Sequence, residues 1–147
     1  MPVPVRLVVD ANTLFSAFLK DSMARRILTH SPIEFSAPAF LFEEVERHLP
    51  SLRERAGLSE RQSSELLGRL RGRMVVVPED SLLPFWEEAK AAMEAIDPRD
   101  VAYVAAALAL PCDGIWSDDA HLKRQTLVTC WTTKELVAVL REHGFPL

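Results

Sequence analysis

The chain has 147 residues, the size of one typical domain and long enough to bury a core without disulfides or structural metals. Its 48% hydrophobic and 26% charged residues are ordinary for a soluble globular protein, and the longest apolar run, Val101–Pro111, is too short to span a bilayer. The net charge of −4 argues against a protein that binds nucleic acid by electrostatic attraction alone, although it is compatible with a carboxylate site that cations neutralise.

The two cysteines, Cys112 and Cys130, give neither a disulfide framework nor a metal-binding spacing, so we expect a reduced, cytoplasmic setting. The N-terminus leads straight into a strand-like run and does not resemble a signal peptide. The sequence has no internal repeat, low-complexity segment or long linker, which predicts a single domain over residues 1–147.

The first half of the chain alternates between strand-like and helix-like segments. A short run rich in β-branched residues, Val5–Val9, predicts a strand buried on both faces. Two short helices are expected next, over Asn12–Leu19 and Ser22–His30, and then a strand over Ile33–Ser36. Pro38 fits the first turn of a helix that reaches about His48. A capping box of Ser59 and Gln62 then predicts a helix from Glu60 to about Arg71.

The second half continues the alternation. Met74–Val77 predicts a third strand that ends at Pro78, and helices are expected over Leu82–Ala95 and from Asp97 to Leu110. Short strands follow at Gly114–Ser117 and Leu127–Thr129, and Thr132 or Thr133 caps a last helix that reaches about Glu142. This alternation predicts an α/β fold of three layers, α/β/α, with a central parallel sheet of four to five strands.

Carboxylates follow the predicted strands at the edge where open α/β sheets bind ligands. Asp10 comes directly after the first strand, and Asp118 and Asp119 come directly after the fourth. Asp97 and Asp100 open a helix that begins near the same edge. Three separate segments therefore deliver carboxylates to one edge of the predicted sheet.

Some of these acids also have structural explanations. Asp97 before Pro98 is typical of a helix N-cap, and Asp100 in the first turn favours the helix dipole. Either Asp118 or Asp119 suits the cap of a short helix. For these residues the structural and the functional interpretation both stay open.

Asp10 and a glutamate have weaker structural explanations. A charge at the end of a buried strand, such as that of Asp10, is costly unless it is paired or binds a metal. On the helix after Pro38, Glu44 lies near the apolar face, whereas Glu43 and Glu46 are expected to be solvated. These positions make Asp10 and Glu44 candidate functional residues.

Such a set of acids suits the hydrolysis of phosphodiesters. That reaction brings an anionic nucleophile to an anionic phosphorus, and one or two Mg²⁺ or Mn²⁺ ions activate water and neutralise the developing charge. These cations take oxygen ligands, chiefly carboxylates and water. The four histidines show no zinc-binding spacing. The acids therefore favour a Mg²⁺ or Mn²⁺ site.

An arginine-rich segment from Arg53 to Arg73 holds six arginines within 21 residues. Two interpretations stay open: a solvated helix face, or a patch that contacts phosphates. Arg61 and Arg69 share one face of the predicted helix, so in the second interpretation they would bind RNA beside the acids. In the first interpretation they serve solubility or pair with Glu60 and Glu65.

Four stretches of the sequence, in order, resemble the PIN-domain family, in particular the toxin components of toxin–antitoxin pairs. They are the opening strand with its D-x-N element, a helix that carries a glutamate, a second aspartate helix, and a closing S-x-D strand and turn. In this sequence they are Val8–Leu14, Phe40–His48, Asp97–Ala107 and Asp113–Leu122. The match runs nearly from end to end, and its specificity comes from the order and spacing of the four pieces.

The resemblance implies a fold of PIN type and roles for individual residues. The four acids of the family match Asp10, Glu44, Asp100 and Asp119. Asn12 and Ser117 match polar positions that orient the acids, and Asp118 competes with Asp119 for the last metal-binding role. The family also implies a Mg²⁺- or Mn²⁺-dependent ribonuclease that is often dimeric and often inhibited by an antitoxin protein.

Two other functions stay open. A haloacid-dehalogenase-like phosphatase would use Asp10 as a covalent nucleophile, but Asn12 stands where its general acid is expected, and no convincing lysine element precedes Asp118 and Asp119. A non-catalytic PIN-like module would bind RNA or a partner protein without cutting. Metal-dependent cleavage of RNA separates both from the ribonuclease.

Overall fold

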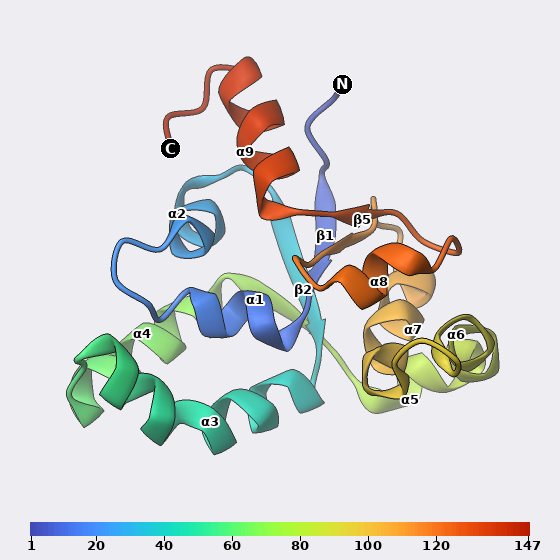
Figure 1. The fold of residues 1–147 in the computed structure, drawn as a ribbon, viewed down its shortest axis with the longest axis horizontal. Helices are drawn as coiled ribbons and strands as arrows, with labels where there is room; N and C mark the ends of the chain where they lie inside the picture. The colour runs from blue at the N-terminus through green and yellow to red at the C-terminus, as the bar shows by residue number, and fades with distance from the viewer.

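The computed structural model describes residues 1–147 and shows a five-stranded sheet between two groups of helices (Figure 1). The strands are β1 (Arg6–Val9), β2 (Glu34–Pro38), β3 (Met74–Val77), β4 (Ile115–Trp116) and β5 (Cys130–Trp131). Their order in the sheet is β3-β2-β1-β4-β5, and every neighbouring pair is parallel. The predicted three-layer α/β/α fold with a parallel sheet is therefore confirmed.

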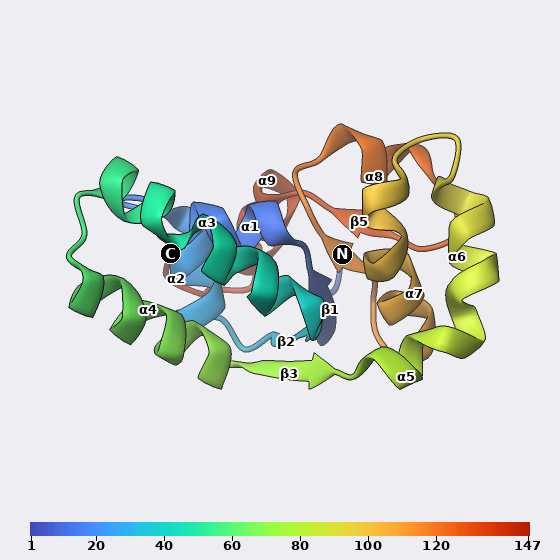
Figure 2. The ribbon, with the colours of Figure 1, turned by 90° about the horizontal axis from the view of Figure 1, so that it is seen from below.

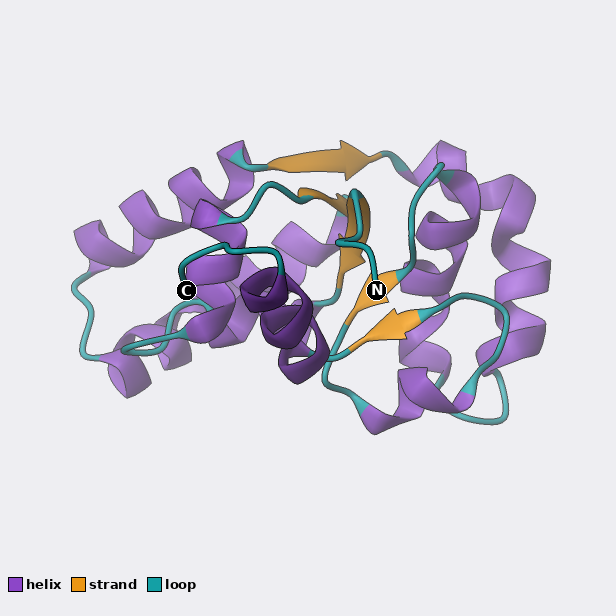
Figure 3. Ribbon diagram, turned by 90° about the horizontal axis from the view of Figure 1, so that it is seen from above, coloured by secondary structure: helices purple, strands orange, loops and turns teal.

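Helices of very different lengths cover the sheet. They are α1 (Ala11–Ser16), α2 (Met23–His30), α3 (Phe40–Ala56), α4 (Glu60–Gly72), α5 (Glu79–Leu82), α6 (Trp86–Met93), α7 (Val101–Ala109), α8 (Ala120–Arg124) and α9 (Thr133–Glu142), with short 3₁₀ helices η1 (Leu83–Phe85) and η2 (Pro98–Asp100). Helices α1 to α4 lie on one side of the sheet, and α5 to α7 lie on the other (Figures 1 and 3). No helix is both long and apolar enough to cross a membrane.

Helix α7 and strand β1 form the centre of the core. Every residue of Val101–Ala107 is buried, and α7 contacts β1, β2 and β4. This explains why the helix is apolar on all sides and rich in alanine, since small side chains let it pack closely against the sheet. β1 is central and pairs with β2 on one side and β4 on the other. The first three strands extend the sheet to one side of β1 and the last two extend it to the other side, so the strand order reverses between β1 and β4. In folds of this class ligands bind beyond the carboxyl ends of the strands at such a point.

Helices α3 and α4 lie side by side as a hairpin that extends from the sheet (Figure 2). The predicted capping box of Ser59 and Gln62 is present at the start of α4. The predicted start of α3 is wrong, because Pro38 ends β2, where its lack of an N–H is tolerated, and the helix begins at Phe40. The predicted end near His48 is also wrong. The helix continues through an exposed Pro50 because the next turn buries Leu52 against the core.

Two further predictions differ from the structure for local reasons. The helix expected over Leu82–Ala95 is divided at η1, which contains Pro84. The fifth strand is Cys130–Trp131 rather than Leu127–Thr129, because the side chain of Gln125 holds the preceding segment in a turn. Its Oε1 accepts hydrogen bonds from the N–H groups of Leu127 and Val128, and its Nε2 donates to two carbonyls.

Candidate active site

Asp10 is buried at the carboxyl end of β1, with 2% of its surface exposed. It is the N-cap of α1, because its Oδ1 accepts a hydrogen bond from the N–H of Thr13 at 2.9 Å. Its Oδ2 accepts a hydrogen bond from the hydroxyl of Ser117 at the end of β4. Burial nevertheless raises the pKa of Asp10 above its ordinary value, because desolvation outweighs these hydrogen bonds.

Ser117 connects Asp10 to the acids that follow β4. Its hydroxyl oxygen accepts a hydrogen bond from the N–H of Asp119 at 3.0 Å while its hydroxyl group donates to Asp10. Ser117 is fully buried, so this bridge holds the β4 turn in a fixed position relative to β1. The structure therefore supports the expectation that Ser117 orients the acids.

Asp119 lies beside two residues that the sequence analysis did not select as site residues. Its Oδ1 accepts a hydrogen bond from the N–H of His121 at 2.8 Å and lies 3.6 Å from His121 Nδ1. His121 Nδ1 lies 3.1 Å from Asp97 Oδ2. One ligand atom each of Asp97, Asp119 and His121 lies within 4.8 Å of the others, a grouping that could hold a metal ion.

Asp100 has a buried carboxylate that no other group of the protein satisfies. Only 8% of its surface is exposed, and its Oδ2 has no hydrogen-bond partner. Desolvation, together with the negative charges of Asp119, Asp97 and Asp10, raises its pKa to about 7. The neighbouring acids therefore add to the effect of burial on the pKa of Asp100.

Glu44 reaches the same region from the first turns of α3. Its side chain is about one-third exposed, and its carboxylate lies 2.8 Å from Arg47 and 3.9 Å from His48. These partners sit one turn further along the helix and hold the Glu44 carboxylate toward their side of α3. Glu44 is thus held by its own helix rather than by the sheet.

A cleft of 640 Å³ brings together Asn12 and three of the four expected acids, Glu44, Asp100 and Asp119. We call it the acidic cleft. Among the residues that line it are Asn12, Glu44, Arg47, Asp97, Arg99, Asp100 and Asp119. Asp10 lies behind this wall, where its charge raises the pKa of Asp100. A smaller polar cleft of 330 Å³, lined among others by Asn12, Arg99, Asp118 and Asp119, opens next to it.

The remaining expected site residues lie in other settings. Asp118 is exposed, and its two oxygens accept hydrogen bonds from the N–H and hydroxyl of Thr133 at 2.7 and 2.6 Å, at the start of α9. Arg61 forms an ion pair with Glu65 at 3.0 Å, as expected if this helix face is solvated. Neither Arg61 nor Arg69 lines the acidic cleft, so their role in RNA binding stays a prediction.

Sequence patterns did not indicate four site residues, of which His121 lines the smaller polar cleft and the other three line the acidic cleft. Arg47 and Arg99 are the two arginines on its wall, and Asp97 and His121 flank Asp119. Asp97 is the predicted N-cap, but its carboxylate also accepts hydrogen bonds from the Arg99 guanidinium, which lowers its pKa to about 2. The spacing of Asp119 and His121, two residues apart at the start of a helix, is the sequence signal that could have indicated that His121 belongs to the site.

The donor set fits a divalent cation. The fit rests on the unpartnered Oδ2 of Asp100, since a buried carboxylate oxygen without a donor is rare unless a ligand satisfies it. Asp119, Asp97 and His121 form a grouping of further oxygen and nitrogen donors, and Asp97 and Asp119 line the same cleft as Asp100. Carboxylate oxygens suit Mg²⁺ and Mn²⁺.

Comparison with known proteins identifies the family of the chain. A family model described as PIN domain matches residues 8–141, which include every acid of the acidic cleft as well as Asp10. No curated protein sequence gives a match. Because the family model covers most of the chain, and because the parallel sheet carries its acids at the carboxyl edge as the sequence predicts, the chain belongs to the PIN domain family.

Proposed function

We propose that the protein is a metal-dependent endoribonuclease that hydrolyses RNA phosphodiesters in the acidic cleft. PIN domains are generally nucleases, so the family supports a hydrolase acting on nucleic acid. The observation that carries the proposal is the buried, unpartnered Oδ2 of Asp100 beside Asp119. In this proposal residues 1–147 act as one nuclease domain.

Asp100, Asp119 and Glu44 are the residues that we expect to hold Mg²⁺ or Mn²⁺. Bound there, the cation would neutralise charge on the phosphate and lower the pKa of a water molecule. Asp97 and His121 lie close enough to Asp119 to contribute donors or to fix its orientation. Asp118 is the weaker candidate, because Thr133 already occupies both of its oxygens.

Asp10 has a positioning role in this proposal as well as the metal-binding role expected from the family. Both of its oxygens accept hydrogen bonds, one from α1 and one from Ser117. The Ser117 hydroxyl in turn receives the N–H of Asp119. Asp10 therefore fixes the turn that presents Asp119, and its negative charge adds to the attraction of the cleft for a cation.

Arg47 and Arg99 are placed to receive the phosphates of the RNA strand. Their side chains are 68% and 84% exposed, and both line the acidic cleft. Each is already held by a carboxylate, Arg47 by Glu44 and Arg99 by Asp97, so each guanidinium keeps N–H donors free on the solvent side. Asn12, exposed at the start of α1, adds a neutral donor on the opposite wall.

Cleavage of labelled RNA with Mg²⁺, with Mn²⁺ and with a chelator tests the proposal. We expect cleavage only with a divalent cation, and its loss in Asp100→Asn, which keeps the shape and removes the charge. Asp80→Asn is the matched control, because Asp80 is an exposed helical aspartate that lines none of these clefts. Cleavage that persists in the chelator, or equally in Asp100→Asn, would refute the proposal.

The two alternative functions have less support. A phosphatase would need the Asp10 carboxylate free to attack phosphorus, but Asp10 is buried and both oxygens accept hydrogen bonds. A non-catalytic module would have no need for the unpartnered carboxylate of Asp100. The RNA cleavage experiment, run beside a small phosphoester substrate, separates all three functions.

We further propose that the enzyme is a cytoplasmic toxin that forms homodimers or higher homo-oligomers and that an antitoxin protein inhibits. The sequence resemblance supports the toxin role, the oligomer and the antitoxin. The two free cysteines suit a reducing setting such as the cytoplasm. Induced expression in a host cell should arrest growth, and co-expression of the product of the neighbouring gene should restore it. Normal growth despite accumulation of active enzyme would refute the toxin role.

A further inference from the structure

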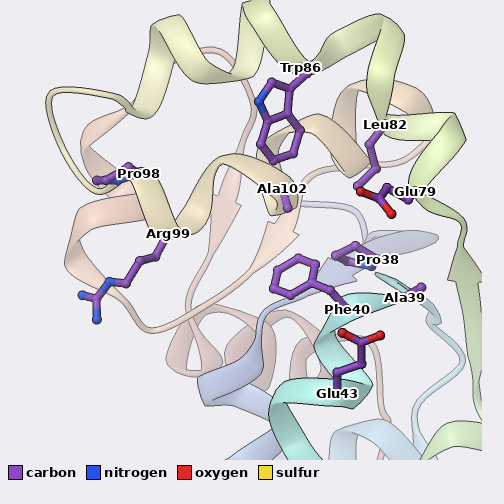
Figure 4. A pocket seen from close by; sticks show the side chains of 10 residues that line it. All are labelled: Pro38, Ala39, Phe40, Glu43, Glu79, Leu82, Trp86, Pro98, Arg99 and Ala102. Carbon is purple, nitrogen blue, oxygen red and sulfur yellow. The ribbon is translucent and has the colours of Figure 1, made fainter.

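A second cavity, of 410 Å³, opens beside the acidic cleft and is not part of the proposed metal site. Its wall consists of the start of α3, the α5–α6 segment and the start of α7 (Figure 4). Its volume falls within the range of small-ligand sites, roughly 300–1,000 Å³. The residues that the argument uses are Phe40, Glu43, Glu79, Trp86 and Arg99.

Two aromatic rings face this cavity from different elements. The indole of Trp86 projects from the start of α6, and the ring of Phe40 projects toward it from the start of α3 (Figure 4). Both residues line the cavity and are only partly buried. Phe40 is held from behind by Tyr103, with ring centroids 5.4 Å apart. This pair of rings suits a flat, aromatic ligand such as a nucleobase.

Two carboxylates lie at one end of the cavity without a partner in the protein. Glu43 and Glu79 both line it, and Figure 4 shows their carboxylates on the side away from Pro98. Neither side chain takes part in any hydrogen bond or ion pair, unlike the neighbouring Glu44 and Glu46. Carboxylates accept hydrogen bonds and cannot donate them, so they select a ligand edge made of N–H donors. The sequence analysis expected Glu43 merely to be solvated.

The cavity adjoins the acidic cleft. Arg99 lines this cavity and both polar clefts, and Phe40 lines this cavity and the acidic cleft. A strand of RNA whose phosphate lies in the acidic cleft therefore has a neighbouring nucleotide within reach of the cavity. Arg99, between the two, is placed to contact the phosphate that joins them.

We propose that this cavity binds a guanine base of the substrate RNA, stacked between Trp86 and Phe40 with its N–H edge toward Glu43 and Glu79. The inference rests on the proposed ribonuclease function and adds sequence preference to it. Guanine offers its N1–H and its 2-amino group side by side, which suits a carboxylate. Uracil offers only its N3–H on that edge, between two carbonyl oxygens that repel carboxylates. The enzyme should therefore cut at a fixed distance from guanosine.

Fluorescence of the full-length protein tests the cavity without any need for catalysis. Trp116 and Trp131 are buried and Trp86 is partly exposed, so a stacked base quenches chiefly Trp86. The probes are guanosine, inosine and uridine, in buffer with a chelator. We expect guanosine to bind about tenfold more tightly than uridine, with inosine between them because it lacks the 2-amino group. Equal quenching by guanosine and uridine would overturn the inference.

Three variants define where the signal comes from. Trp86→Phe keeps a ring but removes the fluorophore, so quenching should disappear while light absorption by the probe stays the same. The double variant Glu43→Gln with Glu79→Gln should bring the affinities for guanosine and uridine together. Glu87→Gln is the matched control, since Glu87 is an exposed carboxylate next to Trp86 that does not line the cavity, and it should keep the preference. Quenching that survives in Trp86→Phe would place the base elsewhere and overturn the inference.

Mapping of cut sites in RNA then distinguishes a failure of this inference from a failure of the proposed function. Wild-type cuts should follow guanosine at a fixed spacing, and the double glutamate variant should lose that spacing. If RNA is not cut but guanosine still quenches Trp86 selectively, the ribonuclease proposal fails and the guanine site stands. If RNA is cut without sequence preference and guanosine does not quench Trp86, the guanine site is refuted and the ribonuclease stands.

Discussion

Two turns of the molecule each carry a pair of aspartates, and in each turn the two members differ in what surrounds them. In the turn before α7, Asp97 accepts hydrogen bonds from Arg99 and lies beside His121, whereas Oδ2 of Asp100 has no partner. In the turn after β4, Asp118 is bound by Thr133, whereas Asp119 faces the cleft. In each turn protein donors occupy both oxygens of one carboxylate, whereas the other carboxylate has fewer donors.

The comparison shows that position in the fold does not by itself identify a functional acid. Asp97 and Asp100 are three residues apart at the same helix start, yet the pKa of Asp97 lies at about 2 and that of Asp100 at about 7. The difference comes from donors: hydrogen bonds from Arg99 stabilise the charged form of Asp97, and burial without donors penalises that of Asp100. An unsatisfied carboxylate at a ligand-binding edge is the stronger sign of function.

The largest effect is expected from Asp100→Asn. Removal of a charge that holds the cation should lower the cleavage rate by at least about 100-fold, because the metal contributes several kcal/mol to the barrier. The same change should stabilise the metal-free protein, since it removes a buried charge without a partner. Cleavage kinetics and thermal melting without metal measure the two effects. If the variant loses stability and keeps full activity, Asp100 has a structural role like that of Asp97, and the contrast between the two residues fails.

A second test compares the members of the β4 turn. Asp119→Asn should lose far more cleavage than Asp118→Asn, because only Asp119 lines the acidic cleft while both oxygens of Asp118 are bound by Thr133. Asp118→Asn should instead destabilise the fold by about 1 kcal/mol, because the amide of Asn keeps only one oxygen to accept the two hydrogen bonds from Thr133. Denaturant unfolding and cleavage assays on both variants give the ranking. The reverse ranking would move the metal-binding role to Asp118.

A smaller, pH-dependent effect follows from the raised pKa of Asp100. In the unfolded chain this group ionises near its ordinary value of 3.8, so between about pH 4 and pH 7 the folded state holds the proton more tightly. Its contribution to stability is therefore lost as the pH rises through 7 in metal-free protein. Millimolar Mn²⁺ should raise the melting midpoint, and the increase should be larger at pH 8 than at pH 6. An increase that does not depend on pH would exclude Asp100 as the ligand.

The smallest effect, on RNA binding, is expected when a single arginine inside or outside the acidic cleft is replaced by alanine. Arg47 pairs with Glu44 and Arg61 pairs with Glu65 in similar geometry, but only Arg47 lines the acidic cleft. Arg47→Ala should weaken RNA binding and reduce its salt dependence by about one phosphate contact, whereas Arg61→Ala should change it less. Binding isotherms at several salt concentrations measure both. A larger loss in Arg61→Ala would restore the arginine-rich helix as the RNA-binding surface.

The sequence was sufficient to predict the fold and the convergence of the acids, because both depend on local patterns. Apolar runs marked the strands, and Asp10, Asp100 and Asp119 follow or precede such runs directly. The partners of those acids depend on contacts between distant segments, which no local pattern encodes. The hydrogen bond from Ser117 to Asp10 joins residues 107 positions apart, and the proximity of Asp97 to His121 depends on how two loops meet.

The tight approach of β4 to β5 shows the same limit. Gly114 has a φ of +130°, and a β-carbon there would overlap the carbonyl of Thr129. The sequence around Gly114 does not indicate this contact with Thr129. Thr129 was predicted to be part of a strand, but it lies in the loop before β5. Only the folded arrangement shows why this position requires glycine.

The order of strands across the sheet has a consequence for synthesis of the protein in a cell. The ribosome makes Asp10 and Glu44 long before Asp100 and Asp119. It also makes β4, which pairs with β1, late in synthesis. A nascent chain that has emerged only through β3 has half of the acids, and β1 has no neighbour on its β4 side. Domains generally fold as units, and pairings between distant segments form slowly. The acidic cleft is thus completed only when translation of the domain is nearly finished, and in the proposed ribonuclease a shorter nascent chain would lack half of the acids while it is still attached to its messenger RNA.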